Sequence, residues 1–246
     1  MISKEMLLEI GKKKGLKNKE HIEKDYFQDV FLLNLFGKTN RLVFKGGTAI
    51  YKLYGLSRFS EDLDFSSLDS EPGSVERIIE HVLDNIDFFE LKGMKRTKDS
   101  LLIRISADGI LTKYNSLRID VNLRNKIISG FDVKNYVSEY VDINPFSMRV
   151  LKPGEMMSEK VHSLFARKNA RDLFDLFFLL RMSKLDKNLV KEKLKIFGMK
   201  YDEKLLKKKI NDIEDIWDKE LKAFVLAELP DFDVVKKFVL VRLGIK

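Results

Sequence analysis

The sequence predicts an α+β fold, a mixed β-sheet with flanking helices followed by a helical C-terminal region. The apolar run Leu42–Phe44 suits a buried strand, and residues 117–124 alternate strictly between apolar and polar side chains, which is typical of a half-buried strand. Beyond the turns at residues 144–145 and 152–154, apolar residues recur almost entirely at helical spacing. We therefore expect a core domain with N-terminal helices over residues 1–150 and a helical domain over residues 151–246.

The composition is that of a globular protein with a sizeable core, because 44% of the 246 residues are hydrophobic. The chain has no cysteine, which excludes disulfides, thiolate metal sites and a cysteine nucleophile. Its apolar runs are too short to span a membrane and it begins without a signal-peptide pattern, so we expect a soluble, cytoplasmic protein with no membrane partner. A formal net charge of +8 favours polyanionic partners such as RNA or nucleotides, although solvated charged helices would give the same excess.

The first half of the chain carries helical and extended patterns in turn. Ser3–Lys14 predicts a short amphipathic helix, and a longer one begins at Asn18, whose side chain suits a cap. A further helix is expected between Glu71 and Glu90. Two strands follow, at Leu101–Ala107 and Leu117–Arg124, and the basic stretch 95–98 before them predicts a turn within reach of phosphates.

A glycine pair follows the first predicted strand. Gly46 and Gly47 let the backbone turn sharply and approach a ligand closely. Thr48 then suits the cap of a short helix that Gly55 ends. The N-terminus of such a helix is suited to binding phosphate.

Two aspartates follow this helix on the predicted strand Phe59–Ser66. Asp62 and Asp64 are two residues apart, so on a strand both carboxylates point to one face while Leu63 and Phe65 point to the other. Adjacent carboxylates repel each other unless a cation lies between them, and a hard divalent cation with oxygen ligands is the natural counterpart.

The glycine pair and the aspartates together resemble the signature of the nucleotidyltransferase fold. More narrowly, they are similar to the AbiEii/AbiGii toxin family of nucleotidyltransferases. The matching residues are Gly46, Gly47, Thr48, Arg58, Ser60, Asp62 and Asp64. The alternative interpretation is a glycine turn beside a solvated acidic strand.

The resemblance implies a third carboxylate on a strand beside the aspartate pair. Asp120 is the candidate, because it lies on the polar side of the alternating segment. The alternative is an aspartate that pairs with Arg118 or Arg124.

A second motif lies in the helical region. Lys160, Arg171, Asp172 and Asp175 match the family's helical lysine and its Arg-Asp-Leu-x-Asp-Leu segment. Asp172 also suits an acidic first turn in a helix capped by Asn169, so a structural role remains open.

The resemblance implies a Mg²⁺-dependent transfer of a nucleoside monophosphate from a nucleoside triphosphate to an acceptor, the 3′ end of tRNA, and a separately encoded antitoxin. The residues implied to hold Mg²⁺ are Asp62, Asp64 and Asp120. Those implied to contact the nucleotide are Gly46, Gly47, Thr48, Arg58, Ser60, Lys160 and Arg171, with Asp172 among the catalytic residues and the helical domain closing the cleft. The alternatives are a small-molecule or protein acceptor, and a non-catalytic nucleotide- or RNA-binding module.

Overall fold

The computed structural model describes residues 2–68, 71, 73–124 and 126–245, which form two compact units. Unit 1 comprises Met1–Gly55, Phe59–Asn125 and Phe131–Val150. Unit 2 comprises Leu56–Arg58, Lys126–Gly130 and Leu151–Lys246. Two short segments from the first 150 residues, 56–58 and 126–130, pack with the helical unit and belong to it.

The helices of unit 1 are α1 (Lys4–Lys13), α2 (Lys19–Lys38), α3 (Gly46–Tyr54) and α4 (Ser74–Leu83). The first two follow residues whose side chains satisfy free backbone N–H groups. The Ser3 hydroxyl accepts the N–H of Met6 at 3.2 Å, and the Asn18 side chain accepts the N–H of Glu20 at 2.8 Å. The starts predicted for the first two helices are thus confirmed.

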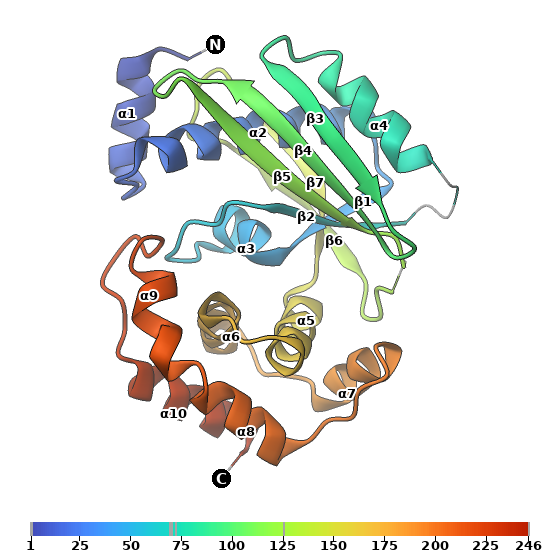
Figure 1. Cartoon of the computed structure of the whole chain (residues 1–246), viewed down its shortest axis with the longest axis vertical. Coiled ribbons are helices and arrows are strands. Elements are labelled where there is room, and N and C mark those ends of the chain that lie inside the picture. The colour runs from blue at the N-terminus through green and yellow to red at the C-terminus, as the bar shows by residue number, and fades with distance from the viewer. Residues whose placement is uncertain (1, 69–70, 72, 125, 246) are drawn as a thin grey trace. The chain divides into compact units, whose positions relative to one another are not determined.

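The sheet of unit 1 is mixed, as predicted, and its strand order is β3-β4-β5-β2-β1-β7-β6 (Figure 1). The strands are β1 (Leu42–Lys45), β2 (Leu63–Ser67), β3 (Phe89–Arg96), β4 (Ser100–Asp108), β5 (Tyr114–Asn122), β6 (Phe131–Tyr136) and β7 (Phe146–Leu151). β2 lies between β1, to which it is antiparallel, and β5, to which it is parallel.

Three features of the sheet differ from the prediction. Lys95 and Arg96 end strand β3 and do not form a turn. β2 begins at Leu63, so Asp62 lies just before the strand. β6 and β7 were not predicted, although residues 131–134 and 146–150 alternate between apolar and polar side chains.

The core of unit 1 lies between one face of the sheet and two helices. α2 packs against β5 and α4 against β3, and in Figure 1 α2 passes behind β4 and β5. The side chains of β4 and β5 that are buried on this face are Leu101, Ile103, Ile105, Leu117, Ile119 and Val121. The opposite face of these strands carries polar side chains.

A buried ion cluster joins α2 to α3. Lys52 has no exposed side-chain surface, and its Nζ lies 2.5 Å from Oδ1 of Asp25 and 2.7 Å from Oδ1 of Asp29. The hydroxyl of Tyr140 donates to Asp25 at 2.6 Å and that of Tyr136 to Asp29 at 2.9 Å. Burial alone would raise the pKa of Asp25, but the neighbouring ammonium groups outweigh it and hold this pKa well below its usual range.

Unit 2 is helical. Its helices are α5 (Pro153–Ala166), α6 (Ala170–Met182), α7 (Lys187–Ile196), α8 (Glu203–Asn211), a single 3₁₀ turn η1 (Glu214–Ile216), α9 (Trp217–Leu221) and α10 (Phe232–Leu243). Within the described residues, four of these α-helices follow residue 185. Trp217 is buried and donates its indole N–H to the carbonyl of Pro230 at 3.0 Å, so it packs inside unit 2. Within the described ranges, no helix has both the length and the apolar composition needed to cross a bilayer.

We expect Lys52→Met to lower the free energy of unfolding by about 3–5 kcal/mol, because it leaves two buried carboxylates without their shared cation. Urea unfolding followed by circular dichroism measures the loss. The control is Lys38→Met at the exposed end of α2, which should change stability by no more than about 0.5 kcal/mol. Equal effects of the two substitutions would contradict a stabilising role for the buried charge.

Candidate active site

The parallel pairing of β2 with β5 brings two of the predicted aspartates together. Asp64 is the register partner of Asp120, and adjacent strands lie about 4.8 Å apart. Paired residues in neighbouring strands project to the same face of the sheet. The core face holds the neighbours of the two aspartates, which are fully buried: Leu63, Phe65, Ile119 and Val121. Both carboxylates therefore lie on the opposite face. Asp62 precedes β2 by one residue.

The N-terminus of α3 lies against the Asp64 side chain. Gly46, the first residue of α3, has φ +76°, and a Cβ added there would lie 2.2 Å from Oδ2 of Asp64. Only glycine both adopts this backbone conformation without strain and leaves room for the carboxylate. The partial positive charge of the helix N-terminus favours an anion in this position.

Asp120 lies in a mixed electrostatic environment. Burial raises the pKa of Asp120, and the negative charge of Asp62 adds to this rise, whereas Arg118 and Lys45 act in the opposite direction. Lys45 is the register partner of Asp64 and comes directly before the glycine pair. The sequence analysis did not include Lys45 among the site residues, although its position immediately before Gly46 could have indicated that it belongs there.

The chemistry of the three aspartates fits a hard divalent cation, because all their donor atoms are carboxylate oxygens on neighbouring segments. Over the part of the chain that the structure describes, however, no three acidic, histidine or cysteine side chains form a ready-made metal site. The Asp64 carboxylate instead lies over Gly46. The expected set of Asp62, Asp64 and Asp120 is thus adjacent in the fold without being assembled as a ligand shell.

Three residues expected to contact the nucleotide have other contacts. Thr48 does not cap α3, because the helix begins two residues earlier, and its hydroxyl donates to the carbonyl of Asp62 at 2.5 Å. Ser60 is buried, and its carbonyl accepts the side-chain amide of Gln28 at 2.9 Å. Arg58 is 2% exposed, so its guanidinium is not available to phosphates in this structure.

The second motif forms a buried ion cluster within unit 2. Arg58 binds Asp175 through Nε at 2.7 Å and through a second nitrogen at 2.6 Å. Lys160 of α5 bridges two carboxylates of α6, at 2.9 Å from Asp172 and 2.8 Å from Asp175, and Arg167 lies 2.8 Å from Asp172. Three cations therefore surround two carboxylates.

The charges in this cluster stabilise one another. Burial alone would raise the pKa of Asp172, but the charges of Lys160 and Arg167 lower it to about 2. Sequence reasoning matched Asp175 to the family motif but did not foresee its partner Arg58, which is 117 residues away. Arg171, also expected at the nucleotide, lies with its guanidinium 5.1 Å from the centre of the Phe224 ring.

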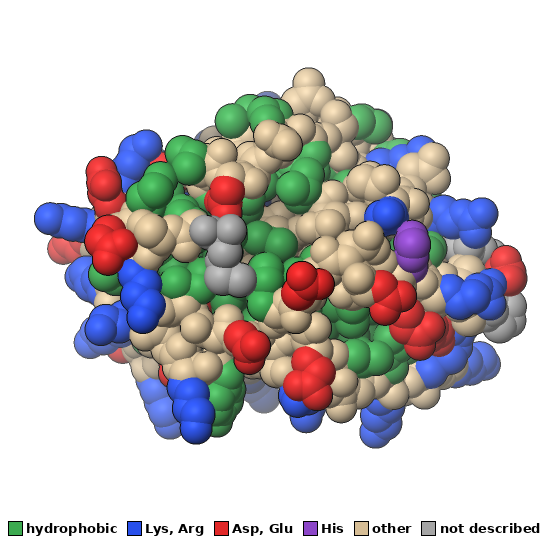
Figure 2. Space-filling view, turned by 90° about the horizontal axis from the view of Figure 1, so that it is seen from above, with side chains coloured by type: hydrophobic (Ala, Val, Ile, Leu, Met, Phe, Trp, Pro, Cys, Tyr) green, Lys and Arg blue, Asp and Glu red, His purple; other side chains and the backbone are tan. Residues whose placement is uncertain are grey.

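The positive charge of the chain is unevenly spread over the surface. Figure 2 shows that on the face seen from above, Lys and Arg side chains lie mostly along the margins, while acidic and apolar side chains occupy the middle. The excess of Lys and Arg is therefore not gathered on that face, and a surface for polyanions has to be sought elsewhere.

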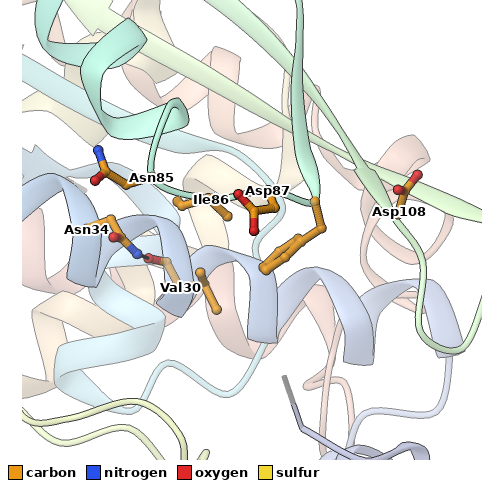
Figure 3. A pocket seen from close by; sticks show the side chains of 7 residues that line it. Val30, Asn34, Asn85, Ile86, Asp87 and Asp108 are labelled. Atoms are coloured by element: carbon orange, nitrogen blue, oxygen red, sulfur yellow. Dashed lines mark hydrogen bonds between the residues drawn. The ribbon is translucent and has the colours of Figure 1, made fainter.

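A pocket of about 410 Å³ in unit 1 is separate from these residues (Figure 3). It is lined by Val30 and Asn34 of α2, by residues 85–88 after α4, and by Asp108 at the end of β4. Because its lining contains no Lys or Arg, it is not suited to a triphosphate.

Comparisons with known proteins identify the family and related folds. A family model described as the nucleotidyl transferase AbiEii toxin of a type IV toxin–antitoxin system matches residues 30–237. JHP933 from Helicobacter pylori has a similar fold, with a TM-score of 0.60 at 22% identity over 92% of this chain and 91% of that one. MenT4, a nucleotidyltransferase toxin from Mycobacterium tuberculosis H37Rv, gives a TM-score of 0.61 at 19% identity over 92% of this chain and 83% of its own. No curated protein matches the chain.

Gly46→Ala should lower the free energy of unfolding by about 1–3 kcal/mol, the cost of placing a non-glycine residue at positive φ, and should displace the Asp64 carboxylate as well. Gly37→Ala, near the end of α2 with nothing within 4 Å of the added Cβ, is the matched control. It should stabilise the protein by about 0.5–1 kcal/mol. Denaturant unfolding of both variants is the measurement, and equal effects would show that Gly46 is not under this constraint.

Asp172→Asn should make unit 2 less stable at neutral pH but not in acid. The folded-state pKa of about 2 lies below the ordinary 3.8, so the stability that Asp172 contributes is complete above about pH 4 and is lost as the pH falls through 2. We expect a deficit of about 2 kcal/mol at pH 6 that disappears near pH 2. Trp217, the single tryptophan, reports the unfolding of unit 2 by fluorescence. Glu228→Gln, at an exposed position, is the control, and a deficit independent of pH would refute the electrostatic origin.

Proposed function

Because the chain belongs to the AbiEii family of nucleotidyl transferase toxins and is thus a nucleotidyltransferase, we propose that it transfers a nucleoside monophosphate from a nucleoside triphosphate to the 3′ end of tRNA. One observation carries the assignment of the site: Asp64 and Asp120 are register partners, beside the glycine that begins α3. This places carboxylates next to a helix N-terminus, where the metal-binding and phosphate-binding parts of such a reaction are both needed.

The carboxylates of unit 1 are proposed to hold the metal. Asp62, Asp64 and Asp120 would bind Mg²⁺, whose charge, when bound, neutralises the phosphates of the nucleotide. The acceptor hydroxyl forms a bond to the α-phosphorus, the bond from that phosphorus to pyrophosphate breaks, and the hydroxyl gives up its proton. Asp120 either completes the ligand set or takes this proton.

Backbone groups are proposed to bind the triphosphate. The N–H groups of Gly46 and Gly47 lie in the first turn of α3, where helix N–H groups have no partner within the helix. Thr48 supports this arrangement indirectly, because its hydroxyl ties the first turn to the backbone of Asp62.

The second motif is assigned to the same reaction by its match to the family. Lys160, Arg171 and Asp172 are the proposed residues, with Lys160 offsetting negative charge on the triphosphate. The type IV family also implies a separately encoded antitoxin, and we propose that the protein acts in the cytoplasm.

The reaction is tested by incubating the protein with tRNA, Mg²⁺ and each labelled nucleoside triphosphate in turn, and by separating the products on a denaturing gel. Wild type should label tRNA with at least one nucleotide, and chelation of the metal should abolish the labelling. Asp64→Ala should reduce it by more than about 100-fold, since losing even an outer partner of a metal ligand costs 10–100-fold.

The control variant is Asp87→Asn, an exposed carboxylate that lines the pocket of Figure 3, and it should keep wild-type activity. Labelling that survives Asp64→Ala would refute the metal assignment. Label on a small molecule or on protein instead of tRNA would identify a different acceptor class. No labelling with any nucleotide would contradict the proposed reaction.

A further inference from the structure

The side of β3, β4 and β5 that faces away from α2 and α4 is an open sheet surface. On β4 and β5 the residues of this open face alternate with the core residues and are exposed or half-buried along both strands. The face continues into the candidate active site, because Asp120 belongs to it and Asp64 lies beside Asp120 on the next strand.

Two arginines face each other across the middle of this surface. Arg104 of β4 is the register partner of Arg118 of β5, and both are exposed. Like charges directly opposite on neighbouring strands destabilise a sheet. Neither guanidinium has an ion-pair partner within the described residues. An arrangement that costs stability and forms no ion pair within the described residues is suited to an anionic ligand such as phosphate.

The arginine pair lies next to the proposed catalytic residues. Arg118 is two residues from Asp120 on the same face of β5, and its charge acts on that carboxylate. Lys95 of β3 is level with Asp120 across the sheet, because Lys95 is the register partner of Leu102 in β4 and Leu102 is the register partner of Asp120 in β5. Cations thus border the site on the side of β3 and β4.

An exposed aromatic ring lies at the other end of β5. Tyr114 is 69% exposed and shares the open face with Arg118 and Asp120. Its ring contacts no other ring or cation in the part of the chain that the structure describes. Six residues of strand separate it from Asp120, about 20 Å. The turn before it is rigid, because the Glu23 carboxylate accepts the N–H of Leu111 at 2.7 Å and the Thr112 hydroxyl at 2.5 Å.

We propose that this open face binds the single-stranded 3′ end of the RNA acceptor, an inference that rests on the proposed function. Tyr114 stacks on an unpaired base, and the Arg104–Arg118 pair binds a backbone phosphate between that base and the terminal hydroxyl at Asp120. Ser106 and Ser116, register partners between the ring and the arginines, supply hydroxyls for the ribose 2′-OH. An aromatic face available for stacking favours a single strand, since the bases of a duplex are already stacked.

The experiment measures binding of a fluorescent single-stranded 12-nucleotide RNA by anisotropy, without nucleotide or metal, so that the result does not depend on catalysis. Arg104→Ala/Arg118→Ala should weaken binding at least about tenfold. It should also reduce the slope of log affinity against log salt by about 0.7, for one phosphate contact on a single strand. This variant should fold at least as stably as wild type, because it removes a like-charge pair. Tyr114→Ala should weaken binding about 5- to 100-fold with little change in the slope.

The charge-matched control is Lys208→Ala/Lys237→Ala, which removes two exposed positive charges from α8 and α10 of unit 2 and should leave RNA binding unchanged. The arginine variant should also raise KM for tRNA and leave KM for the nucleotide unchanged. A DNA strand of the same sequence should bind more weakly than the RNA.

Three results would overturn the proposal. In the first, the arginine and tyrosine variants bind the single-stranded RNA as tightly as wild type. In the second, these variants lose as much affinity for blunt duplex RNA or for an acidic peptide as for the single strand, and in the third the arginine variant raises KM for the nucleotide instead of KM for tRNA. If tRNA is labelled by wild type but these variants bind RNA normally, the proposed function stands and only the surface assignment fails. If the single strand binds as expected but no nucleotide is transferred, the reaction fails and the surface assignment stands.

Discussion

A lysine ammonium with no exposed surface holds α3 against α2, and the candidate active site depends on it. Lys52 is shared by Asp25 and Asp29, and each carboxylate also accepts a tyrosine hydroxyl. Buried charges are tolerated only when they are paired and hydrogen-bonded in a fixed geometry, so this cluster admits few alternative positions of α3. Because the phosphate-binding turn is the first turn of the same helix, its position relative to the sheet is set by charge pairing as well as by apolar contact.

The register of the sheet then determines which side chains meet at that turn. Leu63 and Phe65 of β2, like Ile119 and Val121 of β5, are fully buried, so a slip of one residue would move carboxylates into the core and apolar side chains out of it. The free-energy penalty for that exchange fixes Asp64 beside Asp120 and opposite Lys45. Gly46 completes the arrangement, since any side chain there would take the space of the Asp64 carboxylate.

The sequence predicted those features of the fold that depend on residues close together in the chain. The first helix, the cap at Asn18 and the alternation along β5 could be predicted because each depends on residues close in sequence. β3 was missed because, as an edge strand, it buries only Phe89, and its alternation of apolar and polar residues stops at Gly93. The ion-pair partners of charged residues could not be predicted from the sequence. Arg58 and Asp175 are 117 residues apart, and neither composition nor spacing indicates that two segments so distant will pair.

The arginines of the chain show how unusual the pair on the open face is. Those that bind carboxylates are Arg58, Arg77, Arg96, Arg124 and Arg167, and those that lie over aromatic rings are Arg149, Arg171, Arg181 and Arg242. Within the described residues, Arg104 and Arg118 have neither kind of partner, although they are adjacent. Since most guanidinium groups here are satisfied within the protein, two that face each other without forming an ion pair point to a counter-charge from outside. Because the two arginines lie on the same face as Asp120 and Arg118 is only two residues from it, the substrate of the reaction is the natural source of that charge.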